Sequence, residues 1–183
     1  FNGTNCYNIY RDYSLEKNIS PMSKSDFINN LKNDENFKQM GFFHSDAIIY
    51  GFSHTHLNGT GVSDFGDIML MPTMGEPKLN SDAYRSPFSH KNEKATAGYY
   101  AVKLDNHNID VRLTATTRVG LQEYTFNQSG KANIILDLNH RDKLLMGDVR
   151  IIDSQTVEVL RRSEAWARDQ YVYARIVFSV PMQ

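Results

Sequence analysis

The sequence contains little cysteine and no long apolar run, and each absence excludes a class of protein. Cys6 is the single cysteine among 183 residues, so no intrachain disulfide can form. No apolar stretch approaches the roughly 20 residues of a membrane-spanning helix, and no signal peptide opens the chain. We therefore expect neither a disulfide scaffold nor a membrane partner.

The sequence also lacks an excess of charge of one sign. Lys and Arg number 20 and Asp and Glu 21, and the basic residues are dispersed along the chain. Nucleic acids and anionic membranes require a basic footprint, so neither is expected as a partner. A length of 183 residues with 40% hydrophobic content suits a single domain with a real core. Because the chain begins at Phe1 without Met, we expect a processed or excised piece.

Short β-branched or aromatic runs dominate the chain from residue 47 onward. Turn-forming residues separate them, and no helical repeat of ten residues intervenes, which argues against a parallel βαβ sheet. The predicted strands are AIIYGF, DIMLMP, GYYAVKLD, IDVRLTATT, LQEYTF, ANIILDL, DVRIID, TVEVL and YVYARIVFSV. The sequence therefore predicts a mainly β protein, an antiparallel β-sandwich.

Three further local patterns refine this expectation. In residues 109–114 the apolar side chains alternate with polar ones, which is typical of a half-buried strand. Residues 171–178 are apolar on both faces, which indicates a central strand. Residues 1–40 are predicted to be an irregular segment with one short helix over residues 25–33, capped by Ser25.

The most unusual stretch is residues 51–72, GFSHTHLNGTGVSDFGDIMLMP, which we call the glycine-rich segment. It combines two His, four Gly, Ser and Thr hydroxyls and two Asp before an apolar strand. Glycines weaken regular structure, and polar groups need partners, so folding alone rarely requires this mixture. A ligand site explains it economically.

The chemistry of the glycine-rich segment has several interpretations. His54 and His56 would share one face of a strand and could hold a metal with a nearby carboxylate, or bond the loop and a ligand. The Gly59–Gly61 backbone could offer N–H groups to sugar hydroxyls, carboxylates or phosphates, or form a plain tight turn. It lacks the Lys and spacing of a P-loop.

The acidic residues and the aromatic residue of this segment also have more than one interpretation. Asp64 and Asp67 could act as a general acid and base, or accept backbone N–H bonds within the loop. Phe65 could stack on a sugar ring or fill the core. No GxSxG motif or activated nucleophile is present. From its own residues, the segment suits a hydroxyl-rich ligand without forming a complete active site.

Three other polar clusters stand out. Residues 161–170 hold the single Trp and are predicted to form a charged corner between two strands. In residues 138–142, Arg141 and Asp142 are expected to pair or cap locally. Residues 89–100 contain a His and a Glu whose relative geometry the sequence does not fix.

The glycine-rich segment resembles the signature of glycoside hydrolase family 92, the exo-acting α-mannosidases. Further blocks follow in the family's order: FSHKNEKATAGYYAVKL, LTATTRVGLQEYTF, ILDLNHRD and RRSEAWARDQYVYARIVFS. The resemblance covers roughly residues 41–181, and none is found in the first forty residues. Departures from the family pattern include Arg112, where an acid is common, and Gln122, where His is common.

The resemblance implies a two-domain enzyme. Residues 41–183 would form most of its N-terminal supersandwich, related to mutarotase, and an (α/α)6 barrel absent from this chain would be the catalytic domain. Family members are inverting and calcium-dependent, with the acid, the base and most Ca²⁺ contacts in the barrel. The resemblance therefore implies no catalytic residue and no metal ligand in this chain, which alone would be inactive.

The resemblance carries over to particular residues. It implies a wall of the interdomain mannose-binding cleft formed by His54, His56, Gly59, Thr60, Gly61, Asp64 and Asp67, with Phe65 beside them. It implies an interdomain or structural role for Arg161, Arg162 and Trp166.

The expected function is that of one domain of an exo-α-mannosidase, of the α-1,2 type, acting in N-glycan degradation. The expected partners are terminal α-mannosides and the catalytic domain of the same polypeptide. A secreted, periplasmic or cell-surface location is expected from the family. The alternatives are a stand-alone carbohydrate-binding sandwich without catalysis and an adhesion sandwich whose loop binds protein.

Overall fold

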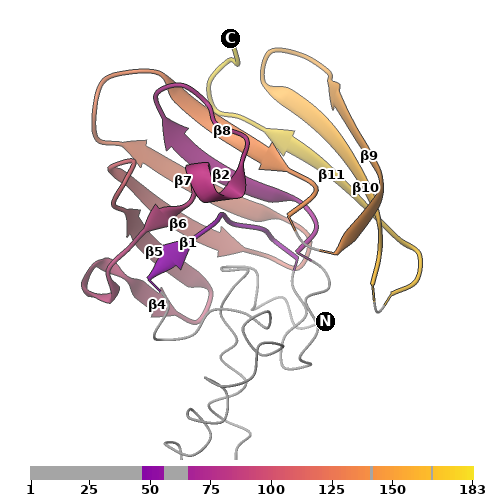
Figure 1. Ribbon diagram of the computed structural model, residues 1–183, viewed down its shortest axis with the longest axis horizontal. Coiled ribbons are helices and arrows are strands. Elements are labelled where there is room, and N and C mark those ends of the chain that lie inside the picture. The colour runs from indigo at the N-terminus through magenta and orange to yellow at the C-terminus, as the bar shows by residue number, and fades with distance from the viewer. Residues whose placement is uncertain (1–46, 56–65, 141, 166) are drawn as a thin grey trace, which may run out of the picture.

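The computed structural model describes residues 47–55, 66–140, 142–165 and 167–183. In this part the chain is mainly β, and every hydrogen-bonded strand pair is antiparallel, as the sequence predicts. Figure 1 shows the strands gathered into layers, with short helical turns between them. The helix predicted over residues 25–33 lies outside the described residues.

The elements follow the predicted strand order closely. They are β1 (Ile48–Ile49), β2 (Met69–Met74), α2 (Ser81–Tyr84), β3 (Ser86–Pro87), the 3₁₀ helix η2 (His90–Asn92), β4 (Lys94–Thr96), β5 (Tyr99–Leu104), β6 (Ile109–Ala115), β7 (Gly120–Phe126), β8 (Ala132–Asp137), β9 (Lys143–Ile151), β10 (Thr156–Glu164) and β11 (Gln170–Val177). The short strands β3 and β4 were not predicted, because neither carries a β-branched run.

The strands form four hydrogen-bonded sheets among the described residues. The largest is four-stranded in the order β4-β5-β6-β7, and β2 pairs with β8. β1 pairs with β3, and β11-β10-β9 form what we call the C-terminal sheet. Within the four-stranded sheet and the C-terminal sheet, successive strands are joined as hairpins, which are the short connections that antiparallel pairing allows.

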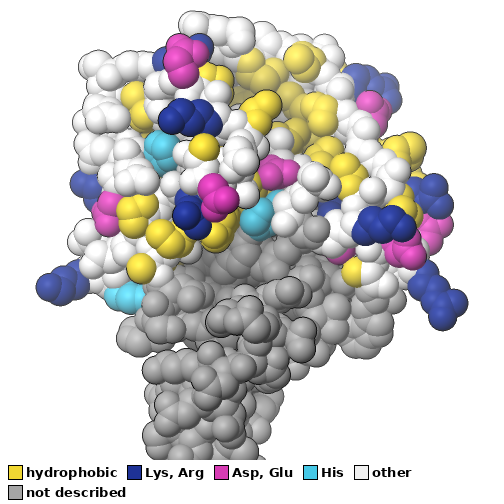
Figure 2. Space-filling model, viewed as in Figure 1, with side chains coloured by type: hydrophobic (Ala, Val, Ile, Leu, Met, Phe, Trp, Pro, Cys, Tyr) yellow, Lys and Arg dark blue, Asp and Glu magenta, His cyan; other side chains and the backbone are white. Residues whose placement is uncertain are grey.

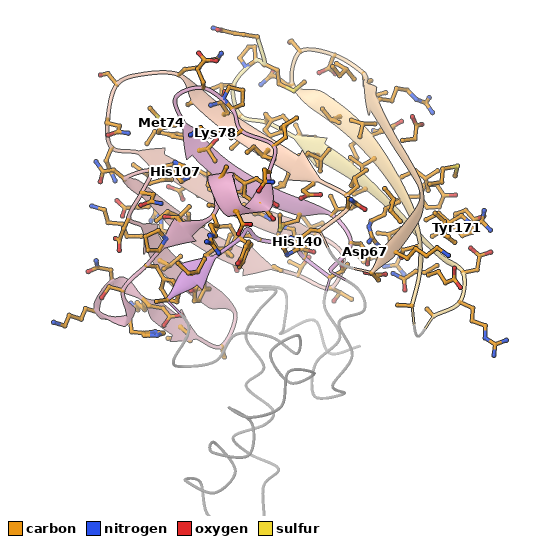
Figure 3. The ribbon with its side chains drawn as sticks, in the orientation of Figure 1. Asp67, Met74, Lys78, His107, His140 and Tyr171 are labelled. Carbon is orange, nitrogen blue, oxygen red and sulfur yellow. The ribbon has the colours of Figure 1, made fainter. Side chains whose placement is uncertain are left out.

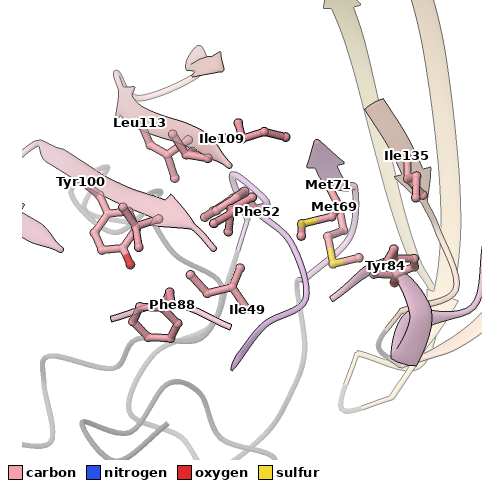
Figure 4. Packing of buried hydrophobic residues seen from close by; sticks show 13 residues of the cluster. Ile49, Phe52, Met69, Met71, Tyr84, Phe88, Tyr100, Ile109, Leu113 and Ile135 are labelled. Atoms are coloured by element: carbon pink, nitrogen blue, oxygen red, sulfur yellow. The ribbon is translucent and has the colours of Figure 1, made fainter. Parts of the chain in front are cut away.

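The core lies between the four-stranded sheet and the strands β1, β2 and β8. In β6, Ile109, Val111 and Leu113 are buried while Asp110 and Arg112 are exposed, so the predicted alternation is confirmed. These side chains pack with Phe52 and with residues of β2, β5 and β8 (Figure 4). Burial of each aliphatic side chain contributes about 1.5–3 kcal/mol, so this cluster fixes the sandwich.

The C-terminal sheet departs from two expectations. β11 pairs only with β10 among the described strands, and its side chains alternate between exposed and half-buried. The prediction of a central strand over residues 171–178 is therefore wrong for this chain, because its aromatic side chains, such as Tyr173, lie on the open face. β10 extends through Glu164, so Arg161 and Arg162 lie within a strand and not in a corner.

The surface is mixed in charge. Figure 2 shows basic and acidic side chains scattered over the visible face, with apolar side chains between them. Within the described residues, no helix is long and apolar enough to span a membrane.

Candidate functional site

The described ends of the glycine-rich segment meet the C-terminal sheet through a buried ion pair. Asp67, two residues before β2, is 1% exposed, and Arg161 of β10 is fully buried. Arg161 Nη1 donates to Asp67 Oδ1 at 2.9 Å. Figure 3 shows Asp67 where the start of β2 approaches the C-terminal sheet.

Arg161 reaches the interior because β10 alternates regularly. Val157, Val159, Arg161 and Ser163 are the buried residues of this strand, so one guanidinium lies on an otherwise apolar or small face. A buried charge is stable only when it is paired and fully hydrogen-bonded. The surroundings of Arg161 meet that requirement.

Arg161 makes hydrogen bonds with three different parts of the chain. Besides its bond to Asp67, Nε donates to the Leu138 carbonyl at 2.6 Å and Nη2 donates to the Asp142 carbonyl at 2.9 Å. The Asp142 carboxylate lies 3.3 Å from Nη2 and is 2% exposed. The expected local pairing or capping by Arg141 and Asp142 is not tested, since Arg141 lies outside the described residues. Among the described residues, Asp142 bonds Arg161.

Asp67 also ties the two described ends of the glycine-rich segment together. Thr55 Oγ1 donates to Asp67 Oδ2 and accepts from the Asp67 backbone N–H, both at 3.2 Å. The Gln170 amide of β11 donates to Asp67 Oδ1 at 2.8 Å. Both carboxylate oxygens are thus hydrogen-bonded by protein groups.

The electrostatics of this cluster are set by burial. Desolvation raises the pKa of Asp67 above its ordinary value, because burial penalises the carboxylate. The Arg161 charge opposes this shift, and the second carboxylate, Asp142, adds to it. One guanidinium therefore serves two buried carboxylates.

His54 is fixed by the four-stranded sheet. The Gln122 side chain of β7 lies 2.8 Å from His54 Nε2, and Gly120 packs against the imidazole. A Cβ on Gly120 would lie 2.1 Å from the ring, so only glycine leaves room for it. Gln122, noted as a departure from the family pattern, therefore orients a predicted site residue.

The structure fixes the geometry of the His and Glu in residues 89–100. Glu93 accepts from the Tyr100 hydroxyl at 2.8 Å, and its other oxygen lies 2.8 Å from His90 Nδ1. The Glu93 side chain is 6% exposed, and the His90 ring meets Phe88 edge-on. This cluster joins η2 to β5.

Arg162 lies on the opposite face of β10 from Arg161. It forms a two-point ion pair with Asp169, and its guanidinium carbon lies 5.2 Å from the centre of the Tyr171 ring. Figure 3 shows Tyr171 on the outer side of the C-terminal sheet.

The remaining predicted site residues lie outside the described residues and stay predictions. They are His56, Gly59, Thr60, Gly61, Asp64, Phe65 and Trp166. Of the predicted sugar-binding residues, the structure therefore places His54 and Asp67. The side chain of His54 contacts the four-stranded sheet at Gln122, and that of Asp67 contacts the C-terminal sheet at Arg161.

The described residues do not suit a calcium ion. No group of three or more His, Cys, Asp or Glu among them is placed to hold a metal. Asp67 and Asp142, two buried carboxylates, are occupied by Arg161. No chemistry of this part of the chain is therefore assigned to a bound metal.

Two bonds of the buried cluster were not predicted from the sequence, that of Thr55 to Asp67 and that of Asp142 to Arg161. A signal was available: continuing the alternation of Val157 and Val159 places Arg161 on the buried face, where it must find carboxylates.

Comparisons with known proteins identify the family. The model of the glycosyl hydrolase family 92 N-terminal domain matches residues 21–183. The expectation that the first forty residues carry no family resemblance is therefore wrong for residues 21–40. No match was found among curated proteins.

Solved structures of the same family are similar to this chain. An α-mannosidase from Bacteroides thetaiotaomicron, in complex with mannoimidazole, is 30% identical over 82% of this chain, with a TM-score of 0.74. A glycosyl hydrolase of the family is 25% identical over 75% of this chain, with a TM-score of 0.63. An inverting mannosidase from Bacteroides thetaiotaomicron is 26% identical over 69%, with a TM-score of 0.59.

The chain spans only part of these relatives. It covers 21%, 20% and 17% of their respective lengths. Because the family model matches most of its residues, the chain belongs to the glycosyl hydrolase family 92 N-terminal domain family.

Proposed function

We propose that this chain is the N-terminal domain of an inverting, calcium-dependent exo-α-mannosidase and forms one wall of its mannose-binding cleft. The observation that carries the proposal is the similarity to an α-mannosidase in complex with mannoimidazole, at 30% identity over 82% of the chain. The glycine-rich segment, suited to a hydroxyl-rich ligand, lies within the matched region.

The chain contributes binding and not the reacting groups. An inverting hydrolysis needs an acid that protonates the leaving oxygen and a base that activates water. Asp67 does not suit either role, because it is buried and both of its oxygens already accept hydrogen bonds. We assign the acid, the base and the calcium ligands to the rest of the polypeptide.

The residues proposed to line the sugar pocket belong to the glycine-rich segment. They are His54, His56, Gly59, Thr60, Gly61, Asp64 and Phe65, with Asp67 holding the end of the segment. Among them His54 has a fixed ring, held by Gln122 and Gly120. A fixed donor or acceptor loses little conformational freedom when a sugar hydroxyl binds.

The proposal extends to substrate and location. The substrate would be a terminal α-mannoside of an N-glycan, of the α-1,2-linked type, and the protein would be secreted, periplasmic or at the cell surface. The interdomain role of Arg162 and Trp166 is part of the same proposal.

Hydrolysis by the complete polypeptide tests the proposal. α-1,2-, α-1,3- and α-1,6-mannobiose are supplied separately, and the first anomer released is recorded by NMR. We expect release of β-mannose, fastest from the α-1,2 substrate, and loss of activity with a calcium chelator that added Ca²⁺ restores. Absence of hydrolysis on all three substrates would refute the proposed activity.

A further inference from the structure

We propose that Arg161 is a positioning residue for mannoside binding, because it fixes both described ends of the glycine-rich segment. The inference rests on the proposed function. It assigns to a residue of the C-terminal sheet an effect on sugar affinity that acts through Asp67 and Thr55.

The guanidinium of Arg161 is held rigidly. It donates to Asp67 from one side, and to the carbonyls of Leu138 and Asp142 from the others, at distances from 2.6 to 2.9 Å. A planar guanidinium bonded in three directions has no freedom to rotate. Asp67 therefore has one position relative to β10.

The position of Asp67 in turn sets that of Thr55. The Thr55 hydroxyl bonds both the carboxylate and the backbone N–H of Asp67, so it links residue 55 to residue 67. His54, held by β7, directly precedes Thr55. The network thus sets how the ends of the segment lie relative to the four-stranded sheet.

Stability alone accounts poorly for a charge at this position. Val157 and Val159 share the face on which Arg161 lies, and apolar residues can replace buried ion pairs without loss of stability. The ion pair carries one property that an apolar residue lacks, namely directional bonds to defined partners. Its contribution is the geometry that it imposes on Asp67.

Kinetics of the complete polypeptide test the inference. Arg161→Lys keeps the charge, but an ammonium group cannot bond Asp67, Leu138 and Asp142 at once in the same geometry. We expect KM for an α-mannoside to rise about tenfold while kcat changes less than threefold, as for lost substrate binding. Thr55→Val, which replaces the hydroxyl by a methyl group, is also expected to raise KM.

The double variant adds a test of the pathway. If Arg161 and Thr55 act through the same carboxylate, the effect of Arg161→Lys with Thr55→Val is smaller than the product of the single effects. Multiplicative effects would overturn the inference. Should Arg161→Lys fail to fold, the KM of Thr55→Val decides, and an unchanged KM contradicts the inference.

Two control variants separate positioning from stability. Val159→Ala removes a buried side chain from the same face of β10 and is expected to lower Tm without raising KM. Arg175→Lys alters the exposed pair with Glu158 in the same sheet and should leave KM unchanged. If Val159→Ala raises KM as much as Arg161→Lys does, the inference is overturned. An inactive wild-type polypeptide would instead refute the proposed function itself.

Discussion

Asp67 and Arg161 are separated by 94 positions in the sequence, yet Arg161 Nη1 lies 2.9 Å from Asp67 Oδ1 and neither side chain reaches solvent. The pair joins the start of β2 to the middle of the C-terminal sheet. It therefore links the segment proposed to bind sugar with strands far along the chain.

Burial of Asp67 predicts a particular sign of pH dependence. Desolvation raises the pKa of Asp67 above its ordinary value of 3.8, so the folded state holds this proton more tightly than the unfolded state. Between the ordinary pKa and the folded-state pKa of Asp67, the free energy of unfolding falls as pH rises. This fall is complete above the folded-state pKa. Relative to Asp67→Asn, the wild type should therefore lose stability as pH rises from 3.8.

Urea unfolding of both proteins over this pH range measures the effect. The Asp67→Asn variant keeps an oxygen that can accept from Arg161 and Gln170 but has no carboxyl group to titrate. The prediction is contradicted if the free energy of unfolding of the wild type, relative to that of Asp67→Asn, rises with pH. The Arg161 charge would then affect the pKa of Asp67 more than desolvation does.

The close approach of His54 to Gly120 predicts that a methyl group will not fit there. Gly120→Ala would place its Cβ 2.1 Å from the imidazole, so the ring or the strand must move. We expect a loss of about 1–3 kcal/mol in the free energy of unfolding, as for an overpacked site. Urea denaturation measures it.

Two comparisons control this prediction. In a His54→Ala background, Gly120→Ala should cost little, because the ring is gone. A Cβ at Gly147 would lie 3.2 Å from a flexible methyl of Leu138 and at ordinary contact distance from Leu144, so we expect Gly147→Ala to cost less than Gly120→Ala. Equal losses at both glycines would contradict the role assigned to His54.

Glu93 is predicted to stabilise the junction of η2 and β5. Glu93→Ala removes the acceptor of the Tyr100 hydroxyl and the partner of His90, at a cost of about 2–3 kcal/mol. Glu76→Ala, which breaks the exposed pair with Lys131, should cause no measurable loss in Tm. A Glu93→Ala variant as stable as the wild type would show that this cluster is dispensable.

The His107 ring is predicted to carry a proton on Nε2 and not on Nδ1. Its Nδ1 accepts from the Met74 backbone N–H at 3.4 Å, so the proton must lie on Nε2, which faces the Tyr84 carbonyl at 3.0 Å. Figure 3 shows His107 beside Met74. Nitrogen chemical shifts of the ring at neutral pH should show an Nε2–H imidazole, and an Nδ1–H tautomer would contradict the bonding described.

The fold could be read from the sequence because period-two alternation directly reports which face of a strand is buried. Residues 109–114 show this well, since their apolar side chains form the core. The order of strands within sheets could not be read, because pairing depends on contacts between distant residues. The apolar run at 171–178 therefore indicated a central strand, whereas β11 lies at an edge of the C-terminal sheet.

The candidate site was predictable only in part, because its contacts also join residues that are distant in the sequence. The composition of the glycine-rich segment marked His54 and Asp67, but not their partners. Gln122 and Arg161 lie 68 and 94 positions away from His54 and Asp67, respectively. No local pattern reports such contacts, although the buried face of β10 required an acidic partner for Arg161.

The most direct test of the central claim, that the glycine-rich segment forms the wall of a mannose pocket, is kcat/KM on an α-mannoside. The complete polypeptide is compared with its His56→Ala and Asp64→Asn variants, and with Asp110→Asn on the exposed face of β6 as a control. We predict a loss of at least about tenfold for the first two variants, or about 1.4 kcal/mol of transition-state stabilisation, and none for the control. An unchanged kcat/KM in both segment variants would contradict the account.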